Sequence, residues 1–155
     1  MPGRAADLLL TLPVVVASAG PTWWLLDGPA SFVAVTGALF VGLGAVILVR
    51  LPAEHPGPGI GAANRVTLLR AALALPVLAL GILALGPVEV GAMPNAVIWW
   101  IIGTSTVAMV LDGFDGRVAR RTATETDFGA RFDMEFDAAL IMALSVLAWS
   151  SGKVG

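Results

Sequence analysis

Apolar residues gather into five stretches, and most polar residues fall between them. The stretches cover approximately residues 8–26, 30–49, 66–88, 95–111 and 138–150. A membrane-spanning helix needs about 20 apolar residues, a length that the second and third stretches meet directly. The fourth and fifth meet it only if their helices continue into the charged segment between them. The first is interrupted by Pro13, Gly20 and Pro21. The pattern predicts an all-α, polytopic membrane helix bundle with about five transmembrane helices.

Residues 1–26 also fit a secretory signal peptide. Arg4 would stand at its start, residues 8–16 would form its apolar region, and Ala17-Ser18-Ala19 resembles a cleavage site. Asp7 and the tryptophan pair that follows fit a retained helix better. We prefer the retained helix, and the rest of the topology is the same under either interpretation.

Composition supports a membrane protein. Hydrophobic residues make up 57% of the 155 residues and charged residues only 13%, with a mean hydropathy of +0.88. Soluble domains contain about 25% charged residues. The chain has no cysteine, which excludes disulfides and thiolate metal sites. No basic tract indicates a nucleic-acid partner.

The distribution of basic residues predicts the orientation, because lysine and arginine stay on the cytoplasmic side. Eight of the nine basic residues lie in the N-terminus, the 50–70 connection and the 112–137 segment. The tryptophans fall at the opposite ends of their stretches, as an interfacial belt would: Trp23, Trp24, Trp99, Trp100 and Trp149. We expect a multi-pass protein of the inner (plasma) membrane with the 112–137 segment facing the cytoplasm.

A linker rich in proline and glycine, residues 52–61, divides the chain. Residues 1–51 would form an N-terminal pair of transmembrane helices, and residues 62–155 the functional part.

The 112–137 segment carries 11 of the 20 charged side chains beside apolar spans. Ionisable groups in such places are costly and usually functional. Helical spacing puts two sets of residues each on one helix face: Asp112, Asp115, Gly116 and Ala119; then Gly129, Asp133 and Asp137. A short turn between the two helices would bring the two aspartate pairs face to face.

Four converging carboxylates would repel one another unless cations lay between them. Oxygen ligands without nearby histidine or cysteine favour Mg²⁺ or Mn²⁺ over zinc. Gly116 and Ala119 leave room for a ligand to approach the backbone, and Arg120 offers a planar fork for phosphate oxygens.

These residues resemble the signature of the CDP-alcohol phosphotransferase family. The chain contains D-x-x-D-G-x-x-A-R, eight further residues, and G-x-x-x-D-x-x-x-D, with the fixed positions Asp112, Asp115, Gly116, Ala119, Arg120, Gly129, Asp133 and Asp137. Upstream, Asn64, Thr67 and Arg70 resemble an N-x-x-T-x-x-R stretch that often opens the first core helix of that family. The resemblance covers about residues 60–155.

The resemblance implies a membrane enzyme of phospholipid synthesis. It would move a substituted phosphate from a CDP-linked alcohol, usually CDP-diacylglycerol, to a small hydroxyl acceptor and release CMP. Asp112, Asp115 and Asp133 would hold two metal ions, and Asp137 would be the base and a further metal contact. The nucleotide site would be formed by Gly116, Ala119, Arg120 and Gly129, completed by Asn64, Thr67 and Arg70. Family members usually have six core helices and form homodimers. Because this chain supplies three core helices, we expect a fragment of a longer protein.

Two other functions fit parts of the pattern. An intramembrane prenyltransferase also uses aspartate motifs and Mg²⁺. The first motif of that family, however, has an acidic residue at the position where this chain has Ala119. An ion or proton transporter would use its acids as a relay. Its carboxylates should lie in the middle of the spans, whereas these lie at the cytoplasmic ends.

Overall fold

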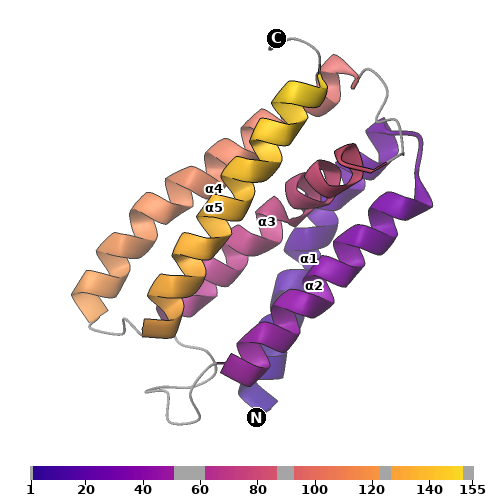
Figure 1. Cartoon of the computed structure of the whole chain (residues 1–155). Helices are drawn as coiled ribbons and strands as arrows, with labels where there is room; N and C mark the ends of the chain where they lie inside the picture. The colour runs from indigo at the N-terminus through magenta and orange to yellow at the C-terminus, as the bar shows by residue number, and fades with distance from the viewer. Residues whose placement is uncertain (1, 51–61, 87–92, 123–126, 152–155) are drawn as a thin grey trace.

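The computed structural model describes residues 2–50, 62–86, 93–122 and 127–151, and this part of the chain is helical, with no strand. Five helices follow one another, alternating in direction along the bundle (Figure 1): α1 Pro2–Leu25, α2 Ala30–Arg50, α3 Ala62–Ala84, α4 Asn95–Thr122 and α5 Asp127–Ser150. The predicted all-α helix bundle is confirmed. The linker at residues 52–61 lies outside the described residues.

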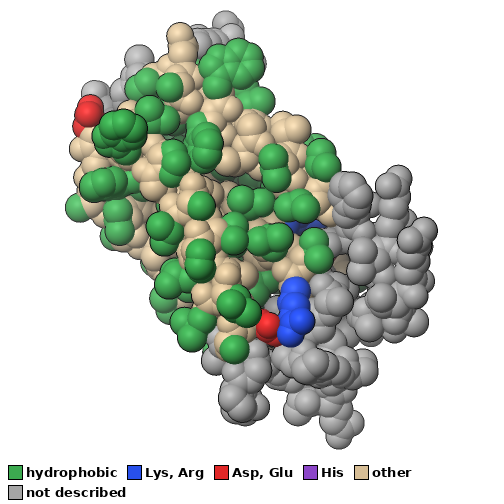
Figure 2. All heavy atoms as spheres, turned by 180° about the vertical axis from the view of Figure 1, so that it is seen from behind, with side chains coloured by type: hydrophobic (Ala, Val, Ile, Leu, Met, Phe, Trp, Pro, Cys, Tyr) green, Lys and Arg blue, Asp and Glu red, His purple; other side chains and the backbone are tan. Residues whose placement is uncertain are grey.

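Three helices are long and apolar enough to cross a membrane within the described residues. They are Ala6–Leu25, Ala30–Arg50 and Arg65–Ala84, and α4 contains a shorter apolar stretch, Asn95–Leu111. Both α4 and α5 continue into the charged segment, as their lengths required. Figure 2 shows hydrophobic side chains over most of one face of the bundle, and charged side chains there are sparse. Large apolar side chains that face outward fit lipid contact.

The first apolar stretch forms a longer helix than its interruptions suggested. α1 continues through both Pro13 and Pro21. Prolines are tolerated in transmembrane helices because neighbouring helices and hydroxyl side chains satisfy freed backbone groups. Residues 17–19 lie inside this helix, where Ser18 is buried and its Oγ donates a hydrogen bond to the Ala72 carbonyl at 3.3 Å. Retention of residues 1–26 as a helix, rather than their removal as a signal peptide, stays a prediction.

Helix α3 lies at the centre of the bundle. Each of the other four helices packs against it, and its residues are buried on several sides (Figure 1). Small side chains make this possible, since four alanines of α3 have no exposed surface: Ala71, Ala72, Ala74 and Ala79. Close packing through small residues is typical of helices in membranes.

Helix α5 packs tightly against α3 at Gly81. A Cβ atom at Gly81 would lie 2.8 Å from the Cβ of Ala143 and 2.9 Å from its Cα. Only glycine fits this contact without a shift of backbone. The contact fixes the distance between α3 and α5, the two helices that carry the charged residues described below.

The tryptophan-bearing helix ends lie together at one end of the bundle. The last turn of α1, the first turns of α4 and the last turn of α5 meet there (Figure 1). Trp24, Trp99 and Trp149 are exposed at these positions. This common level is the arrangement that an interfacial aromatic belt requires.

Candidate functional site

Arg70 is a buried cation in the first half of the apolar helix α3. Its side chain is 1% exposed, the lowest exposure among the charged groups of the described residues, and neighbouring Thr67 is also buried. A buried charge requires a partner, because its transfer out of water is costly. Both residues belong to the upstream set predicted to bind substrate. The third member of that set, Asn64, lies in α3, but its side chain is outside the described part.

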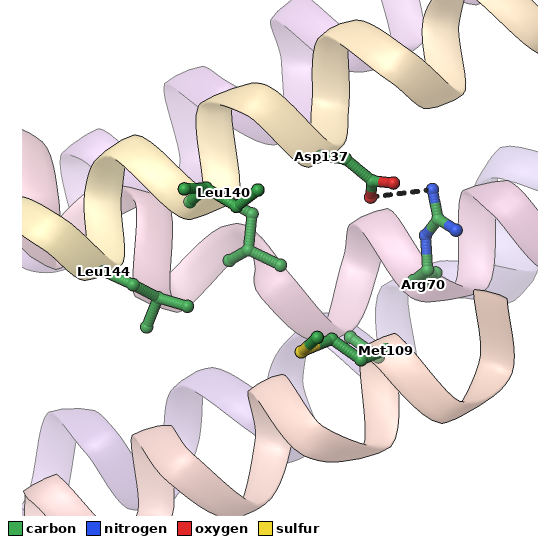
Figure 3. A pocket seen from close by; sticks show the side chains of 7 residues that line it. Arg70, Met109, Asp137, Leu140 and Leu144 are labelled. Carbon is green, nitrogen blue, oxygen red and sulfur yellow. Dashed lines mark ion pairs between the residues drawn. The ribbon is translucent and has the colours of Figure 1, made fainter. Parts of the chain in front are cut away.

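The partners of Arg70 are two aspartates of α5. Asp133 and Asp137 are four residues apart and therefore share a helix face, as the spacing predicted. Nη2 of Arg70 donates a hydrogen bond to Oδ1 of Asp133 and lies 3.2 Å from Oδ1 of Asp137. Figure 3 shows the second of these ion pairs. One guanidinium therefore holds two carboxylates together.

The aspartates are much more accessible than the arginine that pairs with them. Their side chains are 32% and 43% exposed for Asp133 and Asp137 respectively. Each acid therefore keeps part of its side chain at the surface. Glu135, between them in sequence, is exposed, and its spacing of two residues from each acid places it on a different side of α5.

Two of the four carboxylates have a counter-ion within the protein, because Arg70 pairs with both, and the sequence did not predict this pairing. The available signal was weak, since Arg70 lies more than 60 residues from either aspartate in the sequence. Its place within a long apolar stretch was the one indication that it needed an acidic partner.

Four of the predicted site residues are those expected to share one face of α4, and that helix continues through them to Thr122. Their spacing of three, four and seven on one continuous helix is confirmed for Asp112, Asp115, Gly116 and Ala119. Arg120 follows on the same helix, and Gly129 lies in the first turn of α5. The side chains of these six residues are outside the described part, so their meeting with Asp133 and Asp137 stays a prediction.

Helices α4 and α5 run antiparallel, as predicted, but each packs mainly against α3 (Figure 1). Along the described residues they make few contacts with each other. A cleft of about 140 Å³ lies between them, with Arg70 and Asp137 among its lining residues. Its apolar lining comes from two helices (Figure 3): Ala108 and Met109 of α4, with Leu140, Ile141 and Leu144 of α5.

The apolar lining follows from the helical repeat. Leu140, Ile141 and Leu144 lie three, four and seven residues after Asp137, so one face of α5 carries both the acid and the apolar wall. Ala108 similarly precedes Asp112 by four residues on α4.

Sites for whole small ligands usually measure about 300–1,000 Å³, so this cleft accommodates only part of a ligand.

The chemistry of the described donors fits a hard divalent cation. Two carboxylates on one face, both partly exposed, offer the oxygen ligands that Mg²⁺ prefers. No cluster of three or more acidic, histidine or cysteine ligands occurs among the side chains that the structure describes. Asp112 and Asp115, which would complete such a cluster, are outside that set.

Comparison with known families agrees with the motif. The family model for CDP-alcohol phosphatidyltransferase matches residues 60–155, which includes α3, α4 and α5 and every predicted site residue. Neither the curated proteins nor the solved structures gave a match. The match covers more than half of the chain and begins two residues before α3.

Proposed function

The chain belongs to the CDP-alcohol phosphatidyltransferase family, and we propose that it transfers the phosphatidyl group of CDP-diacylglycerol to a small hydroxyl acceptor. Members of this family move a substituted phosphate from a CDP-alcohol in lipid synthesis, and they generally depend on a divalent metal. The prenyltransferase and transporter alternatives explain the family match less well.

The observation that carries this proposal is the polar end of the cleft. Arg70, Asp133 and Asp137 gather charge beside a wall of leucine, isoleucine and methionine side chains. A lipid-linked diphosphate has the same division, with a charged headgroup joined to apolar chains. We infer that the headgroup binds near the charged residues and that the acyl chains leave along the apolar lining.

Asp112, Asp115 and Asp133 would hold two Mg²⁺ ions, with Asp137 as a further contact. Bound there, the metals would neutralise the diphosphate and stabilise the attacking and leaving oxygens of an in-line displacement. Two divalent ions would also offset the repulsion among the four predicted carboxylates.

Asp137 would act as the base. It would take the proton of the acceptor hydroxyl while the acceptor oxygen bonds to the phosphorus that carries diacylglycerol. The bond from that phosphorus to the bridging oxygen breaks, and CMP leaves with the electron pair. Asp137 is the more exposed of the two described acids, which suits a group that must reach an incoming acceptor.

The remaining predicted residues would surround the nucleotide. Gly116 and Ala119 would allow close approach, and Arg120 would pair with a phosphate. Gly129, Asn64 and Thr67 would complete this site, on the cytoplasmic side of the inner (plasma) membrane. The family resemblance also implies a homodimer.

An acceptor screen tests the proposal. Membranes that contain the full-length protein are incubated with labelled CDP-diacylglycerol, Mg²⁺ and one acceptor: glycerol 3-phosphate, inositol phosphate, inositol or serine. We expect one acceptor to give a labelled phospholipid with equimolar CMP, and EDTA to stop the reaction. Gly116→Leu should weaken CDP binding by filling the space beside the backbone. Absence of CMP release with every acceptor would contradict the proposal.

A further inference from the structure

α1 lies outside the region that the family model matches, yet it is tied to α3 by polar contacts. Nε of Arg65 donates to Oδ1 of Asp7 at 3.0 Å, and Nη2 donates to Oδ2 at 3.4 Å. Two turns further along α3, the Ala72 carbonyl accepts the Ser18 hydroxyl. Arg65 and Ala72 are seven residues apart, so they share a face of α3. α1 follows that face.

The same part of α1 also contacts α4. The indole Nε1 of Trp100 donates a hydrogen bond to the backbone carbonyl of Ser18 at 3.1 Å. One short segment of α1 is therefore bonded to α3 through its side chain and to α4 through its backbone. This places α1 against two of the three helices that carry the predicted site residues.

The burial of Asp7 is unusual for a residue that would only help two helices to pack. Its side chain is 7% exposed, whereas that of Arg65 is 49% exposed. A buried carboxylate is costly beside an apolar span, and apolar side chains often replace buried ion pairs without loss of stability. What a two-point ion pair provides better than apolar contact is a defined register and rotation between its helices.

The rotation of α3 matters because its other side carries the site. Five residues correspond to about 140° around a helix, so Arg65 and Arg70 point to different sides of α3. Asp7 of α1 holds the first arginine, and Asp133 and Asp137 of α5 hold the second. A slip or rotation of α3 would move Thr67 and Arg70 away from the acids of α5.

We propose that Asp7 is a positioning residue of the phosphotransferase site, acting through Arg65 on the first turns of α3. This inference rests on the proposed function. Asp7 touches neither the acids nor the cleft lining that the structure describes. Its effect would reach the substrate through the placement of Asn64, Thr67 and Arg70 on α3.

Steady-state kinetics of Asp7→Asn test this role. Loss of a half-exposed ion pair should raise KM for CDP-diacylglycerol by about fivefold. The kcat should change less than KM, because Asp137 itself lies on a different helix and a uniform loss of binding affects KM alone. Asp27→Asn is the matched control. Asp27 is exposed in the turn that follows α1, and its left-handed backbone (φ 59°) also suits asparagine. It should behave as wild type.

Arg65→Gln tests the same ion pair from its other side. Because Arg65 is the more exposed partner, this variant keeps the test open if Asp7→Asn does not fold. It should raise KM to the same extent, and the double variant should be no worse than either single one. The proposal would be overturned if the effects of the two substitutions on KM multiplied in the double variant. A lower maximal rate at unchanged KM would also overturn it, because that result indicates only less folded protein. If wild type and Asp27→Asn transfer phosphate while Asp7→Asn and Arg65→Gln match them, this inference alone fails. A wild-type protein without CDP-dependent transfer would overturn the proposed function as well.

Discussion

Two arginines on α3 form ion pairs that differ in which partner is buried, the arginine or the acid. Arg70 is buried and pairs with two partly exposed aspartates of α5, whereas Arg65 is half-exposed and pairs with the buried Asp7 of α1. Both pairs join α3 to a neighbouring helix. They differ in which partner is left accessible.

The pair with α5 is the one that we propose to bind ligand, and the pair with α1 is the one that we propose to hold α3 in position. On the α5 side the acids are partly exposed, as the proposed metal and acceptor contacts require. On the α1 side the acid is enclosed, and the exposed group is the arginine. Helix α3 is therefore held from two sides, and we propose that the chemistry lies on only one of them.

The largest expected effect comes from removing an exposed acid on the chemical side. Asp137→Asn keeps the shape but removes the proposed base, so transfer should fall by about 10²–10⁴-fold. Metal-dependent CDP binding should persist, because Asp112, Asp115 and Asp133 remain. Radiolabel transfer and equilibrium CDP binding measure the two properties separately.

Glu135→Gln is the control for that variant. Glu135 is an exposed acid of the same helix, and its side chain lies away from Arg70. Its loss should leave transfer unchanged. Wild-type turnover in Asp137→Asn would remove Asp137 from the proposed mechanism.

A smaller effect is expected from the cation that joins the two acids. In Arg70→Lys a single ammonium replaces a guanidinium that contacts Asp133 and Asp137 together. Loss of one charge-assisted contact should lower kcat/KM by about tenfold to a hundredfold. Arg131→Lys, at an exposed position of α5, should stay near wild type. Equal activity of both variants would contradict the bridging role of Arg70.

The smallest effect on catalysis is expected from apolar packing. Gly81→Ala puts a methyl group 2.8 Å from that of Ala143, and such overpacking costs roughly 1–3 kcal/mol of unfolding free energy. Gly103→Ala, where nothing lies within 4 Å, should be neutral or gain up to about 1 kcal/mol in helix propensity. Thermal unfolding in detergent compares them. A Gly81→Ala protein as stable as wild type would mean that α3 and α5 are not in close contact.

Much of the architecture was predictable because apolar length and helical spacing are local properties. The five helices, the continuation of α4 to Thr122 and the shared face of Asp133 and Asp137 all follow from residues close in sequence. The continuity of α1 through Pro13 and Pro21 was less evident, since its contacts with α3 lie far along the chain.

The central position of α3 and the two ion pairs were not predictable from one sequence. Nothing in the pattern around Arg70 distinguishes a substrate contact from a partner for Asp133 and Asp137. The Asp7–Arg65 pair joins residues 58 positions apart and crosses the linker. Long-range pairing of this kind depends on how the helices pack.

The proposed function requires above all that the acids of α4 and of α5 share a single metal and nucleotide site. Electron paramagnetic resonance of Mn²⁺ in the purified protein, with and without CMP, tests it directly. Wild type should show bound Mn²⁺ that CMP strengthens, and Asp112→Asn and Asp133→Asn should each lose that signal. If Asp133→Asn bound Mn²⁺ and CMP as wild type does, the two helices would not form one site.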